Sequence, residues 1–389
     1  MKVLYCNPSF WDYRLPFYKC LNELFKGKFY VVYSTKRYVG REILLNRIKK
    51  ELGDNALPYD KELMFDIQTR SFNSFTEGGK QFPMPLKLFR IICKVKPDVL
   101  ITEGFFQWTP FVILYSILFR VPVFIGYERT LWTERNNRRL KTWHRKLTDK
   151  FVRGYLVNGS ETKKYLLSIG VSEKKIHIGG MSADGSGLRA GIAYLHDDVR
   201  KGMSTKYKNG GGIMFLFCGA LIERKGVEPL LEAWIEHNKN HPKDTLVLVG
   251  DGVLHDKIVK KYGNEPSIFI EGRKEYQEVC KYYGIADVFV LPTIEDNWSL
   301  VIPEAMACGL PVSTSIYNGC HPELVKKGVN GITFDTFKQE SILEALDYFH
   351  HVDLKTFGKN SIELEKEFNT ENSARREYEG LIKQLKNPQ

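Results

Sequence analysis

The segment best suited to chemistry is a polar loop that follows an apolar run and precedes a helical pattern. The apolar run, 288–291, indicates a strand, and the loop after it carries three polar side chains: Glu295, Asp296 and Asn297. A helical stretch opens near Ser299 and has Glu304 in its first turn. Carboxylates at the end of a buried strand can bind hydroxyl groups, and the free N–H groups of a helix N-terminus can bind an anion. The segment therefore favours a ligand that has both, as a nucleotide-sugar does.

A second segment places two adjacent cations between a strand and a helix. The predicted strand ends at Gly219, the loop presents Arg224 and Lys225, and Gly226 precedes a helical pattern. Such cations suit a diphosphate, because the helix dipole and the side chains both favour negative charge. The alternative is a solvated Arg-Lys pair on a surface loop. The carboxylate loop in the same predicted sheet makes that alternative weaker.

Several motifs that would indicate a cofactor are missing from the sequence. It has no GxGxxG after a strand, no Walker A sequence and no Asp-x-Asp triplet, and its seven cysteines form no CxxC pair. Without Asp-x-Asp, the usual clamp of cation and diphosphate is missing. We therefore expect no cofactor and no metal site, and we expect the cysteines to be buried, reduced thiols.

Short apolar or β-branched runs alternate with helical patterns throughout, which predicts parallel sheets covered on both faces. The expected fold class is α/β, with two doubly wound, Rossmann-like domains facing across a cleft. Glycine-rich stretches near 179–187 and 208–212 indicate the junction. The predicted parts are an N-terminal domain (1–190), a linker or hinge (191–212), a C-terminal domain (213–367) and a last helix (368–389) that could return to the first domain.

Basic charge is concentrated in the first half of the chain. Of the net charge of +11, residues 1–190 carry +16 and the remainder carries −5. The first domain should therefore face something anionic. Residues 3–7 indicate a first strand rather than a signal peptide, and the longest apolar stretch, 110–119, is too short to span a bilayer. We expect a cytoplasmic protein, either soluble or peripheral on the inner face of the cell membrane.

Polar side chains also follow the strands predicted in the first half. They are Asp12, Tyr13 and Arg14 in the loop after the first strand, Glu103 after a later one, and Glu128 and Arg129 after the next. Because the carboxyl ends of parallel strands share one edge of a sheet, these residues should face the same cleft. The alternative for each is a helix cap or a surface ion pair.

The stretch from Arg135 to Arg153 mixes basic and apolar residues at helical spacing. Its apolar members are Leu140, Trp143, Leu147 and Phe151, so one face should be apolar and the other cationic. This pattern fits an ordinary surface helix whose apolar face joins the core. It also fits a helix lying on anionic lipid with tryptophan at the interface. Nucleic acid is disfavoured because no nucleic-acid motif accompanies the basic residues.

Taken together, these motifs resemble the donor domain of the retaining glycosyltransferases of family four, the group 1 glycosyl transferases of GT-B fold. The matching stretches are 219–226, 246–252, 270–274, 286–292 and 296–312, in the order and spacing of that family. The resemblance covers roughly residues 150–335. Over 1–150 it concerns architecture alone.

The resemblance implies roles for particular residues of the donor domain. Glu304 would bind the ribose hydroxyls, and Asp296 or Glu295 would hold a hydroxyl of the sugar. Gly219 would lie at the phosphate loop and Arg273 against the base. The amides of Asn297, Trp298, Ser299 and Leu300 would meet sugar and phosphate. Lys225 matches the family's lysine, and Arg224 would supply the charge that Ala220 lacks where many members have arginine.

The function predicted is that of a retaining, metal-independent glycosyltransferase using a nucleoside diphosphate sugar of UDP or GDP type. Its catalytic set would be Lys225, Arg224, Asp296 and Glu295. The basic first domain would hold a glycan or a lipid-linked acceptor in surface polysaccharide or glycolipid synthesis. Two alternatives remain, a nucleotide-sugar epimerase of similar two-domain shape and a non-catalytic scaffold associated with a membrane.

Overall fold

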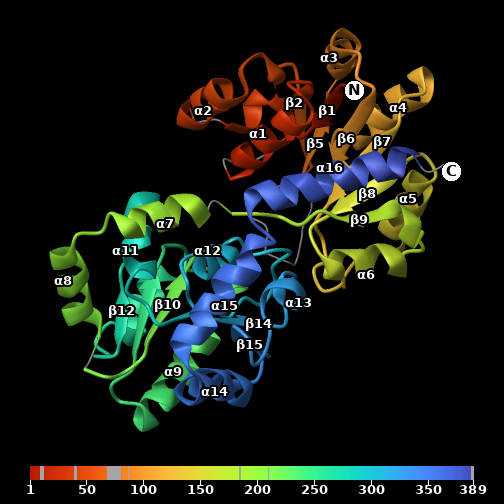
Figure 1. Cartoon of the computed structure of the whole chain (residues 1–389). Helices are drawn as coiled ribbons and strands as arrows, with labels where there is room; N and C mark the ends of the chain where they lie inside the picture. The colour runs from red at the N-terminus through yellow and green to blue at the C-terminus, as the bar shows by residue number, and fades with distance from the viewer. Residues whose placement is uncertain are drawn as a thin grey trace. The chain divides into compact units, whose positions relative to one another are not determined.

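The computed structural model describes residues 1–8, 13–38, 42–67, 80–85, 87–183, 185–208 and 210–386. These residues form two compact units (Figure 1). Unit 1 comprises Met1–Met181 together with Thr370–Gln389, and unit 2 comprises Ser182–Asn369. Each unit is built around one parallel sheet, so the two doubly wound α/β domains predicted from the alternation of strands and helices are confirmed.

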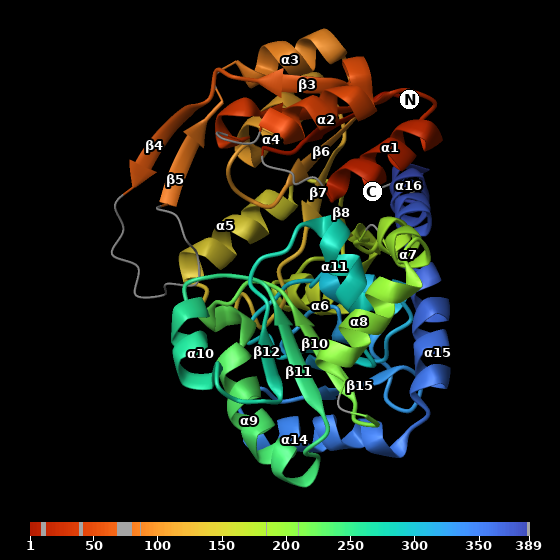
Figure 2. The ribbon, with the colours of Figure 1, turned by 90° about the vertical axis from the view of Figure 1, so that its left-hand side faces the viewer.

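The sheet of unit 1 has seven parallel strands in the order β3-β2-β1-β6-β7-β8-β9. The strands are β1 (Val3–Cys6), β2 (Phe29–Ser34), β3 (Ala56–Tyr59), β6 (Val99–Glu103), β7 (Val123–Tyr127), β8 (Gly154–Val157) and β9 (Ile176–Ile178). Two further strands, β4 (Leu63–Ile67) and β5 (Lys80–Met84), pair antiparallel with each other and extend from this unit (Figure 2). Charge and apolar periodicity gave no prediction of that hairpin.

Helices cover both faces of this sheet. The helices are α1 (Arg14–Leu24), α2 (Glu42–Leu52), α3 (Leu88–Val95), α4 (Thr109–Phe119), α5 (Arg139–Asp149), α6 (Ser160–Ser168) and α16 (Thr370–Lys386). One core holds residues of α3, α4 and α6, and the other holds residues of α1, α2 and α16. The last helix, drawn in blue in Figure 1, packs on α1, where Phe25 and Tyr378 have ring centroids 4.8 Å apart.

The sheet of unit 2 has six parallel strands in the order β12-β11-β10-β13-β14-β15. They are β10 (Met214–Cys218), β11 (Thr245–Val249), β12 (Ile268–Ile270), β13 (Val288–Leu291), β14 (Val312–Ser315) and β15 (Gly331–Phe334). The middle strands are buried on both faces, which is why they appear in the sequence as unbroken apolar runs. The helices are α7 (Gly185–Ala193), α8 (Asp197–Tyr207), α9 (Val227–Asn240), α10 (His255–Tyr262), α11 (Tyr276–Tyr283), α12 (Val301–Ala307), α13 (His321–Leu324), α14 (Gln339–Asp347) and α15 (Leu354–Lys366).

The stretch 191–212, expected to be a linker, is largely helical and belongs to unit 2. The contact boundary lies earlier, between Met181 and Ser182. Glycine at 185 reflects close packing rather than a flexible connection, because a Cβ there would lie 2.5 Å from the Cβ of Ala307 on α12. Tyr207 anchors α8 by packing edge-on against Phe269, with ring centroids 5.1 Å apart.

Among the residues that the structure describes, no helix combines the length and the apolar character that a membrane crossing requires.

Candidate functional site

Two loops meet at the carboxyl ends of the neighbouring strands β10 and β13 in unit 2. The first contains a short 3-10 helix (Glu223–Lys225) that ends at Gly226, and the second follows Pro292. Gly226 adopts a left-handed φ of 67°, and a Cβ at this position would lie only 2.1 Å from the carbonyl oxygen of Pro292. Glycine is therefore needed here for the two loops to touch.

This contact joins the predicted cations to the predicted carboxylate. The Nζ atom of Lys225 lies 2.6 Å from Oδ2 of Asp296, and Nη1 of Arg224 lies 3.5 Å from the same oxygen. Arg224 also donates a hydrogen bond of 2.8 Å to the backbone oxygen of Glu295. The carboxylate that contacts both cations is thus that of Asp296, while Glu295 contributes a carbonyl oxygen.

The electrostatics of this cluster keep Asp296 ionised. Burial by itself would raise the pKa of Asp296, but the charges of Lys225 and Arg224 and the hydrogen bond from Lys225 outweigh it, so the pKa is lowered. The cluster therefore holds two cations and one carboxylate in a partly buried place. Because its net charge is positive, it can attract an anion such as a phosphate.

Two of the four backbone amides expected to meet sugar and phosphate already donate hydrogen bonds to side chains of unit 2. The amide of Trp298 donates to Oδ1 of Asp296 at 3.2 Å, and that of Ser299 donates to Oδ1 of Asn318 at 3.3 Å. The indole of Trp298 is buried, with its ring centroid 6.2 Å from that of Phe368. The hydrogen bonds of the Trp298 and Ser299 amides therefore stabilise the loop. Asn297 and Leu300, the other two residues of the predicted set, are half-buried.

An open pocket of about 430 Å³ adjoins the end of β10. Its lining residues are Cys218, Gly219, Ala220, Val249, Gly250, Asp251, Gly252, Arg273, Lys274 and Val279. Two of them, Gly219 and Arg273, were predicted to bind a donor. Gly250 permits close approach of the two loops, because a Cβ there would lie 1.8 Å from the carbonyl oxygen of Gly219. Lys274 was not predicted to line a site, although it follows Arg273 directly.

Glu304 lies beside this pocket rather than in its lining. The hydroxyl of Tyr283, on α11, donates to Oε2 of Glu304 at 3.4 Å. Burial, followed by the charge of Glu304, raises the pKa of the Cys218 thiol to about 12, and Cys218 lines the pocket. Glu304 is thus near the pocket wall. Tyr283, a residue without a predicted role, donates to one of its oxygens.

Unit 1 assembles a second polar cluster from the residues predicted to face an acceptor. Arg14 forms an ion pair with Glu128 and lies 3.6 Å from Glu103, which also accepts a hydrogen bond of 2.6 Å from the hydroxyl of Tyr5. All four line a narrow pocket of about 20 Å³. The last helix adds Glu377 to this lining, a residue that sequence reasoning missed because it is remote in the chain.

Burial raises the pKa of two carboxyl groups in this second cluster, Glu377 and Glu103. Burial raises the pKa of Glu377 to about 7, with Arg14 lowering it and Glu103 raising it further. Burial also raises the pKa of Glu103. The pKa of the neighbouring Tyr13 rises to about 12, mainly through burial and then through Glu128. Asp12, predicted for the same place, lies outside the described residues.

Arg129 belongs to a different group. Its Nε lies 3.3 Å from Glu134, a buried carboxylate that also pairs with Arg145 at 2.8 Å and with Lys141 at 3.3 Å. The structure therefore separates Arg129 from Glu128, its neighbour in the sequence. It also turns Arg145 of α5 into the interior, although the helical pattern assigned that residue to a solvated cationic face.

The two Rossmann-like α/β units, with a cationic loop at the carboxyl end of β10 and a carboxylate loop at the end of β13, define a GT-B fold. Residues 201–363 match the family described as glycosyl transferases group 1.

Known proteins similar to this chain fall into the same class. An uncharacterized glycosyltransferase of Methanocaldococcus jannaschii is 32% identical over 184 residues, which are 45% of this chain and 50% of the relative. The alpha-monoglucosyldiacylglycerol synthase of Acholeplasma laidlawii is 29% identical over 134 residues, 34% of this chain and 33% of the relative. The chain thus spans half or less of these curated relatives.

Solved structures share the fold over nearly the whole chain. Alr3699/HepE of Anabaena, solved in complex with UDP, superimposes with a TM-score of 0.75 at 14% identity, covering 98% of this chain and 100% of that one. The same Anabaena protein has also been solved with UDP-glucose. At this level of identity the likeness concerns the fold.

Proposed function

We propose that the protein transfers a sugar from a nucleoside diphosphate donor to a glycan or a lipid-linked acceptor. The observation that carries this proposal is the cluster of Lys225, Arg224 and Asp296 beside an open pocket at the end of β10. Such a cluster offers positive charge to a diphosphate and a carboxylate to a sugar hydroxyl. Complexes of the Anabaena protein with UDP and UDP-glucose support UDP as the nucleotide.

Transfer would proceed through stabilisation of the departing diphosphate. Negative charge builds on that group as the bond to the sugar breaks, and Lys225 and Arg224 would stabilise it. Oδ2 of Asp296 accepts a hydrogen bond from the ammonium group of Lys225 and so positions it, and Oδ1 accepts one from the amide of Trp298. Glu304 would accept hydrogen bonds from the ribose, while Arg273 and Lys274 would border the base. A front-face attack with retention, in which the leaving phosphate takes the acceptor's proton, needs no separate base and no metal.

Donor binding provides the first test. A ligand that binds only the folded protein stabilises it by about 2.7 kcal/mol at a hundredfold excess over Kd. We expect UDP to raise the Tm in the presence of EDTA, and we expect GDP to raise it less. Equal Tm values with and without both nucleotides would contradict the donor site, and a shift that requires added Mg²⁺ would contradict metal independence.

Turnover distinguishes the remaining alternatives. A transferase consumes UDP-sugar faster when an acceptor is supplied, whereas an epimerase converts the donor at the same rate without one. A scaffold would bind nucleotide and release neither UDP nor an epimerised sugar.

We further propose that the acceptor is reached at an anionic membrane surface through α5. Four apolar side chains lie along this helix and just beyond its end, and they remain exposed: Leu140 (79%), Trp143 (63%), Leu147 (38%) and Phe151 (47%). We call these four residues the α5 stripe. The interpretation that this apolar face joins the core is therefore wrong for the stripe, because α5 turns Arg145 and Thr148 inward instead.

Neighbouring features support a lipid partner. Exposed basic residues flank the stripe, among them Arg138, Arg139 and Lys146. The preceding helix, α4, exposes four more apolar residues: Leu114, Ile117, Leu118 and Phe119. Helices α4 and α5 connect consecutive parallel strands, so right-handed crossovers put both on one face of the sheet. Apolar side chains between cations suit the interface of an anionic bilayer.

Vesicle sedimentation tests this surface. The protein should pellet with vesicles of phosphatidylglycerol and phosphatidylcholine, and far less with phosphatidylcholine alone or in high salt. Replacing Leu140, Trp143 and Leu147 with Gln should abolish pelleting, and changing Arg138, Arg139 and Lys146 to Glu should weaken it strongly, since each basic residue contributes about 1 kcal/mol near such a surface. Arg145 is left unchanged because its removal would leave Glu134 unpaired.

A matched control uses exposed apolar residues of unit 2. Replacing Tyr194, Val259 and Phe337 with Gln removes a similar amount of exposed apolar surface and should leave pelleting unchanged. If both sets of substitutions behave alike, or if the wild-type protein stays in solution, the α5 stripe has no role at a membrane.

A further inference from the structure

Four of the nine histidines gather at one place in unit 2, on a part of the molecule that the proposed transfer does not use. They are His237, His241, His350 and His351, and they accompany two carboxylates, Asp244 and Asp347. His237 lies on α9, His241 follows that helix directly, and Asp244 precedes β11. Asp347 is the last residue of α14, and His350 and His351 belong to the short helix Tyr348–His351 after it. Segments more than 100 residues apart thus contribute to one cluster.

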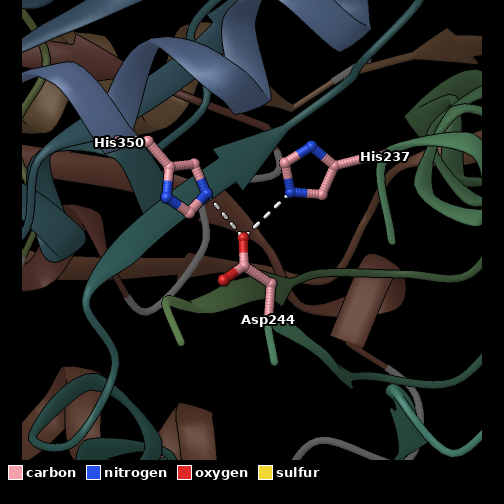
Figure 3. A group of neighbouring side chains, drawn as sticks. All are labelled: His237, Asp244 and His350. Atoms are coloured by element: carbon pink, nitrogen blue, oxygen red, sulfur yellow. Dashed lines mark hydrogen bonds and ion pairs between the residues drawn. The ribbon is translucent and has the colours of Figure 1, made fainter. Parts of the chain in front are cut away.

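Three of these residues direct their side chains to a common point (Figure 3). The Nε2 atoms of His237 and His350 lie 2.9 and 2.8 Å from the same oxygen, Oδ2 of Asp244. One potential ligand atom from each residue lies within 4.8 Å of the others. The second oxygen of Asp244 accepts the amide of Ile213 at 2.8 Å, so the carboxylate is held in one orientation with Oδ2 facing the histidines.

The histidine rings of this cluster pack on one another. The rings of His241 and His350 stack with centroids 3.8 Å apart, and those of His237 and His241 are 4.7 Å apart. His241 is held in turn by a hydrogen bond of 3.0 Å to Asp347, which fixes the plane against which His350 packs. The ring of His350 is thereby held with Nε2 directed at Oδ2 of Asp244.

We propose that His237, Asp244 and His350 form a binding site for a divalent transition-metal ion of the Zn²⁺ type. Two imidazole nitrogens and one carboxylate oxygen are a ligand set that zinc and cobalt prefer to magnesium or calcium. His237 and Asp244 are buried at 2% side-chain exposure each, while His350 is 23% exposed. A water molecule on the side of His350 completes a tetrahedral set of four ligands.

Such an ion would stabilise the fold and take no part in transfer. Asp244 immediately precedes β11, so the cluster is at the amino end of the sheet, whereas the donor loops follow the carboxyl ends of β10 and β13. The ion would link α9 to the short helix Tyr348–His351, which follows α14. Helices α9 and α14 already pack on each other. It is therefore compatible with a transfer reaction that needs no metal.

The test uses full-length, tag-free protein stripped with EDTA and dialysed. We expect one equivalent of Zn²⁺ or Co²⁺ to bind and to raise the Tm by about 5 °C or more at a hundredfold excess over Kd, with no effect of Mg²⁺. Bound Co²⁺ should give visible ligand-field absorption. The shift should be additive with that produced by UDP, which keeps this test separate from the donor-site proposal.

Two neighbouring histidines provide a variant and its control. His350→Gln removes a ligand from the less buried side and should weaken Zn²⁺ binding at least tenfold, with loss of the cobalt absorption. His351→Gln, which alters an exposed histidine bonded to Asp347, should bind like the wild type. Equal responses of the two variants, an equal response to Mg²⁺, or no binding by the wild type would each overturn the proposal. In that case the three residues form a hydrogen-bond network only.

Discussion

Lys225→Ala is expected to lower kcat/KM for sugar transfer by about 10²–10³-fold, the usual effect of removing one preorganised charge from the leaving group. Lys225 is the cation closest to Asp296, at 2.6 Å, and is itself largely buried. Arg224 remains in the variant but lies 3.5 Å from that carboxylate and is already bonded to a backbone oxygen. It can therefore replace only part of the lost charge.

The measurement is steady-state transfer from UDP-sugar, with Lys257→Ala as the matched control. Lys257 lies on the same unit and is 63% exposed, and its carboxylate partner, at 2.7 Å, is Glu228 rather than Asp296. The control should keep kcat/KM within a factor of two. Arg224→Ala should show a comparable loss if Arg224 supplies the charge that Ala220 lacks. If Arg224→Ala keeps the wild-type kcat/KM while Lys225→Ala loses most of it, the lysine alone stabilises the leaving group.

Glu304→Ala is expected to weaken UDP binding by about 10- to 100-fold, because hydrogen bonds to a charged group contribute roughly 1.5–3 kcal/mol. Its carboxylate is half-buried next to the pocket wall and has Tyr283 as a hydrogen-bond donor at 3.4 Å. The other carboxylate oxygen is the group that would meet the ribose. Because the side chain is not fully buried, its removal should leave the Tm of the free protein within a few degrees of the wild type.

Calorimetric titration with UDP measures this effect. Glu340→Ala is the control, since Glu340 also occupies the first turn of a helix in unit 2 but is exposed. An unchanged Kd for UDP in Glu304→Ala would remove Glu304 from the donor site. A loss of folding would instead show that its contact with Tyr283 is structural, and Tyr283→Phe would then distinguish the two roles.

Much of unit 2 follows from local sequence. Strands β10, β11 and β13 are predicted because a strand buried on both faces must be apolar without interruption. The polar residues after them are equally visible, since the carboxyl ends of parallel strands collect a site. The loops that carry Lys225 and Asp296 could therefore be expected to meet before any coordinates, although 71 residues separate these two side chains.

Other features could not be read in this way, because they depend on which surfaces meet. The glycines near 185 suggest a linker by composition, yet Gly185 itself allows a close contact between α7 and α12. The helical pattern of α5 shows two faces, but only packing decides that Arg145 turns inward to Glu134 and that Trp143 stays exposed. A buried ion pair can compete with an apolar face for the interior when the carboxylate has several partners, as Glu134 does.

The sequence by itself determined the α/β class, the two domains, the polar loops after β10 and β13 and the absence of the common cofactor motifs. The tertiary structure alone decided that Asp296 rather than Glu295 contacts the cations, that Glu377 joins Arg14 and Glu103, and that His237, Asp244 and His350 converge. The physical reason is the distance along the chain over which each effect acts. Periodicity and turn chemistry act over a few residues, whereas the contacts of a side chain depend on segments brought together by the burial of the whole core.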